Sequence, residues 1–401
     1  MNIFSKIFYR TIHFSFYLIK PFLPYKPPKI LENISDITVE LMKKNIKNVM
    51  LVSDKMVRNI GLTKSLEENL IKSNINLIIY ENVDPNPTSR NVEEGLALYN
   101  KENCEAIIAF GGGSPIDCAK AIGARIVKPK KSLRKLKGIL KVGKRLPPLF
   151  CIPTTAGTGS ETTITSVISD SETHDKFTIN DFKLVPEYAV LDPITTFTLP
   201  KHLTSTTGLD ALTHAIEAYI GKSTTKTTRK QAIEAIKLIF DNIVTAYNEP
   251  KNYAARKNML MASHIAGKAF SMSYVGYVHA VAHSLGGKYN TPHGLANSVL
   301  LPIFLKEYGK TIYKKISKIS IALGLVSKTE SQEIAFNAFM NKLDEIYKKL
   351  DIPKTINAIK EEDIPSMAKT AAKEANHIYP VPVLLTAKEL EKFYKIVGGL
   401  Q

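Results

Sequence analysis

The stretch EAIIAFGGGSPIDCAKAIGA, residues 105–124, predicts an α/β fold. Its apolar run, residues 106–110, is typical of a strand buried on both faces of a parallel sheet. The run ends in three glycines, residues 111–113, which allow backbone N–H groups to approach a ligand without side chains in the way. We therefore expect a strand whose carboxyl end opens onto a ligand.

A helix is predicted to begin directly after these glycines. Ser114 is a favourable N-cap, Pro115 suits the first helical position, and Asp117 stands where the acid of a capping box would. A strand, a glycine turn and a helix N-terminus together form an anion site that suits a pyrophosphate. The alternative is an ordinary tight turn. The pattern differs from the usual dinucleotide fingerprint, because Ile116 stands where its third glycine would.

Two further segments extend this pattern. Asp54 follows the apolar strand NVMLV, where its carboxylate could accept the ribose hydroxyls and repel a 2′-phosphate, favouring NAD over NADP. A solvated turn acid is the alternative. The segment LFCIPTTAGTGSET, residues 149–162, passes from an apolar strand to hydroxyl and glycine residues that offer many donors to phosphate or ribose. Here the alternative is a low-complexity turn.

Two histidine-rich segments predict a metal site. The segment GLDALTHAIEAY contains Asp210 and His214, which are four residues apart. The segment HAVAHSLGGKYNTPHG contains His279 and His283 at the same spacing. Residues four apart lie on one face of a helix, so each pair can act together. The alternative is that each pair is capped or satisfied within the core.

His293 adds a further candidate ligand, because Pro292 and Gly294 place it in a turn from which it could point back at the helices. One carboxylate with several imidazoles suits a divalent transition ion such as iron, zinc, cobalt or nickel. The affinity order of these ions does not select iron.

The composition indicates a globular enzyme with two domains. The chain has 401 residues, of which 44% are hydrophobic and 23% are charged. Its three cysteines lie in or beside apolar patterns, which favours reduced thiols in a cytoplasmic protein.

The basic tract KPKKSLRKLKGILKVGKR, residues 128–145, contributes strongly to the net charge of +17. The tract carries no interleaved aromatic residues for stacking on bases, so we expect no nucleic-acid partner. Apolar residues recur within it at helical spacing, at Leu133, Leu136, Ile139 and Leu140. This spacing predicts an amphipathic surface helix with a solvated basic face.

Residues 1–34 are expected to form a basic and aromatic appendage. The uncharged stretch from Thr11 to Ile19 is too short to span a bilayer, and no signal-peptide cleavage site follows it. Two hypotheses remain, a helix at a membrane surface and an appendage packed on the protein or on a second subunit. We favour the second.

Strand-like and helical segments alternate over residues 35–200, and helical patterns dominate over residues 201–401. We therefore predict an N-terminal α/β dinucleotide-binding domain with a parallel sheet, followed by an all-α metal-binding domain. The chemistry is expected in the cleft between them.

Six motifs together resemble the iron-containing, or group III, alcohol dehydrogenases, a branch of the dehydroquinate synthase-like fold. The resemblance begins near residue 35 and continues to the C-terminus. The motifs are VSDK (52–55), PNPT (85–88), GGGSPIDCAKAI (111–122), PTTAGTGSE (153–161), GLDALTHAIEAY (208–219) and HAVAHSLGGKYNTPHG (279–294).

The resemblance implies a role for each site residue. The metal ligands would be Asp210, His214, His279 and His293, and His283 would be the catalytic histidine lining the pocket. The positions matching dinucleotide contacts are Asp54, Asn86, Gly112, Gly113, Ser114, Thr154, Thr155, Thr158 and Lys176. We add Asp117 to this cofactor-binding set because it lies in the same glycine motif.

The resemblance implies an NAD(P)-linked alcohol dehydrogenase or aldehyde reductase that uses Fe²⁺, with Zn²⁺ as the alternative, and Asp54 favours NAD over NADP. Hydride would pass between a metal-bound alkoxide and nicotinamide C4. Small primary alcohols such as ethanol or butanol are the expected substrates, with diols and lactaldehyde as alternatives, and a homodimer is expected. Two competing hypotheses are a lyase of the same fold and a non-catalytic metal-binding or membrane-scaffold protein.

Overall fold

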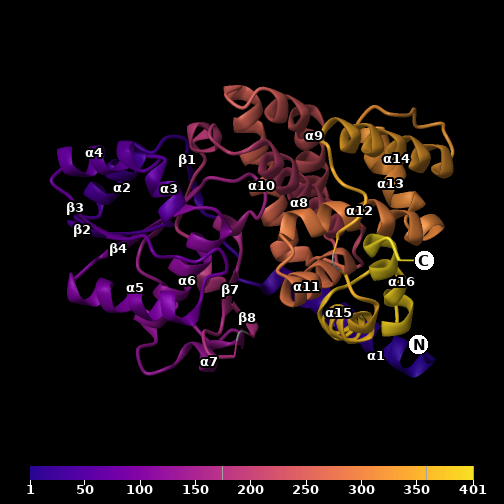
Figure 1. Cartoon of the computed structure of the whole chain (residues 1–401), viewed down its shortest axis with the longest axis horizontal. Helices are drawn as coiled ribbons and strands as arrows, with labels where there is room; N and C mark the ends of the chain where they lie inside the picture. The colour runs from indigo at the N-terminus through magenta and orange to yellow at the C-terminus, as the bar shows by residue number, and fades with distance from the viewer. Residues whose placement is uncertain (174, 358, 401) are drawn as a thin grey trace. The chain divides into compact units, whose positions relative to one another are not determined.

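The computed structural model describes residues 1–173, 175–357 and 359–400. The chain divides into two compact units. One unit is the α/β part, Pro24–Leu199, and the other is helical and joins Met1–Leu23 to the chain from Pro200 onward. Figure 1 labels the helices and strands of each.

The α/β unit is built on a six-stranded sheet in which every neighbouring pair is parallel. Its strand order is β1-β9-β6-β4-β2-β3. The strands are β1 (Lys29–Leu31), β2 (Asn48–Val52), β3 (Asn76–Tyr80), β4 (Ala106–Gly111), β6 (Leu149–Pro153) and β9 (Tyr188–Val190). Because all six run the same way, their carboxyl ends share one edge, which is where ligands bind in sheets of this kind.

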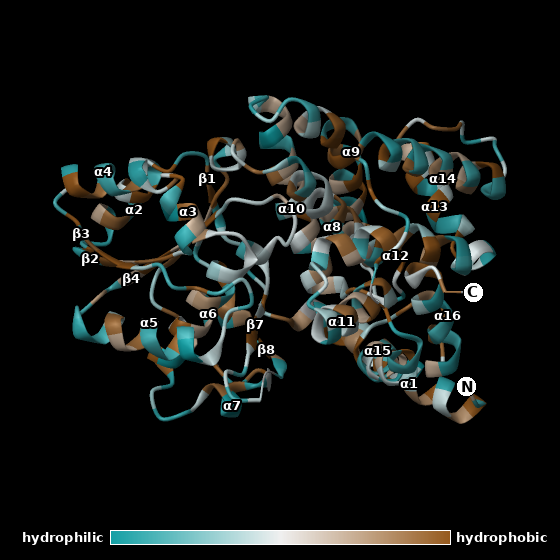
Figure 2. Ribbon diagram, in the orientation of Figure 1, coloured by the Kyte–Doolittle hydropathy of each residue, from teal (hydrophilic) through white to brown (hydrophobic). Residues whose placement is uncertain are grey.

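Side chains alternate across the strands and supply a core on each face of the sheet. Met50 and Val52 pack with residues of α5 and α6, whereas Val49 and Leu51 pack with residues of α2 and α4. The hydrophobic colour of β2 and β4 in Figure 2 follows from this burial on both faces. The helices of this unit are α2 (Asp36–Lys43), α3 (Lys55–Asn59), α4 (Lys64–Lys72), α5 (Ser89–Lys101), α6 (Gly113–Val127) and α7 (Leu133–Leu136), with 3-10 turns η2 (Ser160–Thr162), η3 (Phe182–Leu184) and η4 (Pro193–Thr196).

A smaller sheet contains β5 (Gly138–Ile139), β7 (Thr165–Ser169) and β8 (Lys176–Asn180), in the order β5-β8-β7. The amphipathic helix predicted from the basic tract, residues 128–145, is therefore wrong. Only the four residues of α7 are helical in that tract. Gly138 and Gly143 have positive φ, which ends any helix, and Ile139 and Leu140 are exposed. Leu133 and Leu136 are buried, so the apolar spacing reflects one short turn and a strand.

The second unit is helical throughout its described residues, apart from loops and turns. Its helices are α1 (Ile3–Ile19), α8 (Lys201–Ile220), α9 (Lys226–Asn248), α10 (Tyr253–Ser273), α11 (Tyr277–Tyr289), α12 (His293–Tyr308), α13 (Tyr313–Ala322), α14 (Gln332–Lys349), α15 (Ile364–Ile378) and α16 (Ala387–Gly398), with 3-10 turns η1 (Lys20–Phe22), η5 (Gly309–Thr311) and η6 (Glu361–Asp363). The predicted fold class, a parallel α/β domain followed by a mostly helical one, is confirmed.

The N-terminal segment is divided between the two units, with Met1–Leu23 in the helical unit and the residues from Pro24 onward in the α/β unit. Helix α1 lies against α15 of the helical unit, whereas β1 pairs with β9 at the edge of the large sheet. The sequence pattern missed this division because β1 is only three residues long, and because pairing at an edge leaves no local signal. Within the described residues, we find no helix with the length and apolar character needed to cross a bilayer.

Candidate functional site

Three helices of the helical unit bring four predicted metal ligands together. Asp210 and His214 lie on α8, His279 lies on α11, and His293 is the first residue of α12. One ligand atom from each residue lies within 4.8 Å of all the others. The prediction of a turn at His293 is therefore corrected, since the residue begins a helix.

The close approach of α12 to α8 depends on Gly294. A Cβ atom at this position would lie 2.7 Å from the backbone oxygen of Thr206, which is a severe clash with an atom that cannot easily move. Glycine thus lets the first turn of α12 sit directly against α8. That approach leaves His293 Nε2 3.5 Å from Oδ1 of Asp210.

The spacing of the donor atoms suits a single divalent ion. His279 Nε2 lies 3.8 Å from Asp210 Oδ1, and His214 Nδ1 lies 4.0 Å from Asp210 Oδ2. Two ligands that each lie about 2.1 Å from one ion are separated by roughly 3–4 Å. The Nε2 atom of His279 is buried without a hydrogen-bond partner, which is costly unless a ligand or ion occupies the position. The residues present therefore fit a bound metal.

Glu217 orients one of these imidazoles. Its Oε2 lies 2.6 Å from Nδ1 of His279, and its Oε1 accepts a hydrogen bond of 2.9 Å from the backbone N–H of Val278. A proton on Nδ1 leaves the Nε2 lone pair for a metal, which is the usual arrangement of a carboxylate behind a ligating histidine. The sequence analysis missed Glu217, although it lies seven residues after Asp210 on the same helix and so on the same face.

The electrostatics of this pair favour neutral imidazole. Burial and the neighbouring histidines hold the pKa of His279 well below its ordinary value. Burial also raises the pKa of Glu217 to about 8, although hydrogen bonds from backbone N–H groups within residues 276–279 lower it in part. Neutral imidazole is the form that binds metal.

Replacing Glu217 with glutamine is expected to weaken metal binding by about 10–100-fold, as loss of such an orienting carboxylate usually does. The side-chain volume is kept, so the change isolates the carboxylate. Competition with a chromophoric chelator measures the affinity. The exposed Glu249 supplies a control, and Glu249→Gln should bind as tightly as the unmodified protein. Unchanged affinity in Glu217→Gln would contradict an orienting role.

His283 lies beside the four ligands and makes a different contact. Its ring centroid is 5.3 Å from that of His293, and its Nδ1 lies 2.7 Å from Oε1 of Glu374. The hydroxyl of Tyr379 donates to the same oxygen at 2.6 Å. The side chain of His283 is 42% exposed, in contrast to 3% for His279. Its imidazole is therefore partly accessible to solvent, in contrast to that of His279.

Glu374 was not predicted, because it lies 91 residues from His283 in the chain. Burial alone would raise the pKa of Glu374, but the charge of His283 and hydrogen bonds from His283 and Tyr379 hold it below its ordinary value. The carboxylate thus remains charged and can hold the orientation of His283.

The predicted cofactor residues lie in the α/β unit at the carboxyl ends of adjacent strands. Asp54 follows β2 and caps α3, where Oδ1 accepts a hydrogen bond of 2.9 Å from the N–H of Val57. The glycine turn follows β4. Thr154, Thr155 and Thr158 follow β6, which neighbours β4 in the sheet. Three predicted segments therefore meet on one edge of this unit.

The helix after the glycine turn begins earlier than predicted. Gly112 is the N-cap of α6, and Ser114 makes no capping hydrogen bond. Its hydroxyl donates instead to the backbone oxygen of Pro85, which ties the PNPT loop to the glycine turn. In that loop, Oδ1 of Asn86 accepts a hydrogen bond of 2.8 Å from Nζ of Lys176. Burial lowers the pKa of Lys176.

Asp117 holds the loops together instead of forming a capping box. Its Oδ1 accepts from the hydroxyl of Ser160 at 2.6 Å, and its Oδ2 accepts from the N–H of Val167 at 3.0 Å. Burial raises its pKa, although the nearby Lys120 opposes this shift. Both oxygens have donors, so the placement of Asp117 in the cofactor-binding set is not supported by its contacts.

Lys120 is a fully buried cation that the sequence analysis missed. Its Nζ donates to Thr163 Oγ1 at 2.8 Å, to Thr165 O at 2.9 Å and to Thr163 O at 3.0 Å. Lys120 therefore holds the loop after β6 in place through hydrogen bonds to Thr163 and Thr165. Burial lowers the pKa of Lys120, against the attraction of Asp117.

Comparison with known proteins gives the same family over almost the whole chain. Residues 29–193 match the iron-containing alcohol dehydrogenase family, and residues 204–397 match the C-terminal part of the Fe-containing alcohol dehydrogenase family. The chain is 38% identical to the 1,3-propanediol dehydrogenase of Citrobacter freundii over 338 residues, which cover 82% of this chain and 86% of that protein.

Two further similarities agree with this result. The chain is 37% identical to alcohol dehydrogenase 4 of Saccharomyces cerevisiae over 358 residues, which cover 88% of this chain and 92% of that protein. The structure superposes on an alcohol dehydrogenase from Oenococcus oeni with a TM-score of 0.88 and 32% identity, covering 93% of this chain and 100% of that chain. The chain therefore belongs to the iron-containing alcohol dehydrogenase family, as its motifs predicted, and it is an oxidoreductase.

Proposed function

We propose that this protein is a metal-dependent, NAD-linked alcohol dehydrogenase, or aldehyde reductase, that acts on small primary alcohols of the ethanol or butanol type. The observation that supports this most strongly is the cluster of Asp210, His214, His279 and His293 within the helical unit. Family membership supplies the reaction class. Two relatives are named as a 1,3-propanediol dehydrogenase and an alcohol dehydrogenase, and these names agree with a small substrate for this protein.

In this proposal, the four clustered side chains hold Fe²⁺, with Zn²⁺ as the alternative. The carboxylate supplies charge and the three imidazoles supply softer nitrogen donors, a set that both ions accept. When bound, the ion would act as a Lewis acid on the substrate oxygen. Four protein ligands would leave room for substrate only if the coordination expands beyond four or a water is displaced.

The protein's own groups would handle the proton and the cofactor. His283 would take up or release the substrate proton, with Glu374 holding its orientation. The loops after β2, β4 and β6 would bind NAD, with the pyrophosphate at the N-terminus of α6. Hydride would pass between the carbinol carbon and nicotinamide C4, and the protein would hold these carbons together and exclude water.

Asp54 would select NAD over NADP, and Asp54→Asn tests this separately from the structural role of the residue. Asparagine caps a helix as well as aspartate does, so α3 should be preserved while the charge is lost. Loss of repulsion toward a 2′-phosphate should raise the ratio of kcat/KM for NADPH to that for NADH by about tenfold. An unchanged ratio would assign cofactor choice to another residue.

The whole proposal is tested by NADH or NADPH oxidation at 340 nm, measured anaerobically on chelated protein resupplied with Fe²⁺ or Zn²⁺. Butanal, acetaldehyde and lactaldehyde form the substrate panel. Metal-dependent oxidation of NADH is the expected result. If dinucleotide binds but is never oxidised, the dehydrogenase proposal fails and a lyase reaction, with no net redox change, becomes the leading hypothesis.

We further infer a homodimer that works in the cytoplasm. Cys104, Cys118 and Cys151 are free and buried, and they belong to the same unit of the chain. Burial raises the pKa of the Cys104 thiol to about 11, and the pKa values of the other two are also raised. Such thiols are unreactive, which agrees with a reducing compartment.

A further inference from the structure

Helix α1 is attached to the helical unit through polar side chains. The guanidinium of Arg10 donates to the backbone oxygens of Val381 at 2.6 Å and Pro382 at 3.0 Å. His13 is buried and contacts the backbone oxygen of Asn376 at 3.0 Å. The buried amine of Lys20 donates to Oγ of Ser223 at 2.9 Å and also to its backbone oxygen. These contacts fix one side of the helix.

The opposite side of α1 is apolar and faces outward. Phe4, Phe8 and Phe14 are 80%, 57% and 59% exposed, and Ile7 and Leu18 are 58% and 54% exposed. Because successive helical residues are rotated by about 100°, these five positions fall on one broad face. The helix thus carries apolar side chains on both sides, since Tyr9 and Phe16 pack against the aromatic rings of His377 and Tyr274.

Apolar exposure is concentrated in this segment. Nine of the 23 large apolar side chains that are exposed in the described part of the chain lie in residues 3–22. All four of the exposed phenylalanines among the described residues are there, the fourth being Phe22. A patch of this kind marks an interaction surface rather than ordinary scattered exposure.

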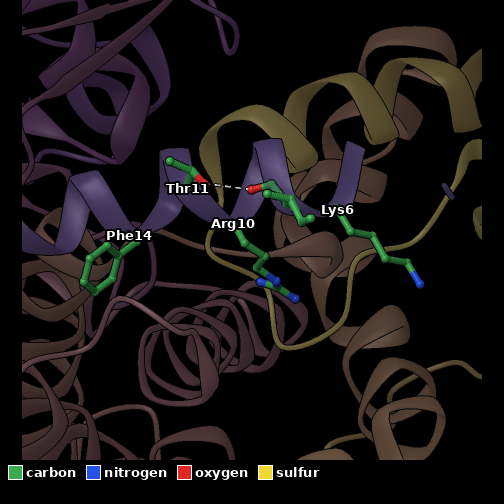
Figure 3. Close-up of a pocket in the computed structure, with 5 residues that line it drawn as sticks. Lys6, Arg10, Thr11 and Phe14 are labelled. Carbon is green, nitrogen blue, oxygen red and sulfur yellow. Dashed lines mark hydrogen bonds between the residues drawn. The ribbon is translucent and has the colours of Figure 1, made fainter. Parts of the chain in front are cut away.

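The charge of the same segment is one-sided. The first 31 residues contain five lysines or arginines and no acid. A shallow hollow on α1 is lined by Lys6, Ile7, Arg10, Thr11 and Phe14, and Figure 3 shows the basic and aromatic side chains projecting from the helix. Basic groups beside exposed aromatic rings are typical of helices that lie in the headgroup region of a membrane.

We propose that the outward face of α1 binds the surface of a membrane that contains anionic lipids. The phenylalanine rings would enter the boundary between headgroups and acyl chains, while Lys6 would face lipid phosphates and carboxylates. The polar contacts of Arg10, His13 and Lys20 would keep the helix joined to the rest of its unit. The helix would lie on the membrane, not cross it.

Charge argues for lipid over a second copy of this chain as the occupant. A symmetric dimer through this face would bring Lys6 of one copy toward Lys6 of the other. The first 31 residues contain no acid, and Glu389 of α16, a single carboxylate, interacts electrostatically with Lys6. The net charge of +17 likewise favours binding to an anionic surface.

Flotation of the full-length protein with lipid vesicles tests the proposal. Binding is expected to vesicles of phosphatidylcholine mixed with phosphatidylserine, to be weaker on phosphatidylcholine alone, and to fall with added salt. The triple variant Phe4→Ser, Phe8→Ser and Phe14→Ser should partition at least about tenfold less onto the mixed vesicles. Its aldehyde reductase activity in solution should be unchanged, which shows that the protein is folded.

Ile334→Ser is the matched control, because Ile334 is an apolar side chain on α14 that is 51% exposed. It should bind vesicles as the unmodified protein does. Absence of binding to the mixed vesicles, or equal binding by the triple variant, would overturn the proposal. A third outcome would also overturn it. If the unmodified protein binds no vesicles and light scattering shows that the triple variant is a monomer while the unmodified protein is a dimer, a second copy of the chain covers the face.

Discussion

The Asp210→Ala variant is expected to bind no metal at the histidine cluster and to lose at least about 10³-fold in kcat/KM. The metal is lost because Asp210 is the only carboxylate among the four clustered side chains. Its oxygens also lie within 4.0 Å of a ring nitrogen of each of the three histidines. Without it, three neutral imidazoles would have to hold a divalent ion alone. A Lewis acid supplies several kcal/mol of stabilisation to the transition state, which corresponds to a rate loss of this size.

Metal content by elemental analysis and kcat/KM from NADH oxidation measure the two effects. Asp241, an exposed acid on α9, supplies the control, and Asp241→Ala should keep both metal and activity. The thermal unfolding midpoint of the metal-free forms shows whether Asp210→Ala folds. A fully loaded Asp210→Ala protein would refute the proposed ligand set, whatever its activity.

The His283→Ala variant is expected to separate metal binding from catalysis. It should retain its metal, because His283 is not one of the four clustered ligands, and lose about 10²-fold in kcat, which is typical of removing a general acid or base. The proposal fails for this residue if the variant loses metal to the same extent as activity.

The conservative variant Glu374→Gln supplies the matching test of orientation. It keeps a group that can accept a hydrogen bond from Nδ1 of His283 but removes the charge that stabilises the imidazolium. A smaller loss of kcat is expected than in His283→Ala, together with a fall in the apparent pKa of the pH–rate profile. An unchanged profile would mean that Glu374 does not act on His283.

The sequence was sufficient for the family and the fold class because these depend on local patterns. The apolar strand before Gly111 and the alternation of strands with helices each leave a signal within about ten residues. The four ligand positions could be proposed for the same reason, since the i,i+4 spacing is visible without a structure. Their roles as ligands stay predictions.

The features that the sequence did not reveal depend on contacts between distant segments. Ser114 has a good capping side chain, yet its hydroxyl is committed to Pro85, so Gly112 caps the helix. Glu374 reaches His283 from a different helix. The spacing of Leu133 to Leu140 fits a helix, but the glycines beside it adopt positive φ and end the turn. Local propensity cannot decide such cases.

The buried amine of Lys120 has a consequence for the thermodynamics of cofactor binding. Its bonds to Thr163 and Thr165 order the loop after β6 when the α/β unit folds, before any dinucleotide arrives. If the loop binds the dinucleotide as proposed, its conformational entropy would be lost during folding and would not be lost again on binding. Lys120 would therefore contribute both to the stability of the α/β unit and to its affinity for the dinucleotide.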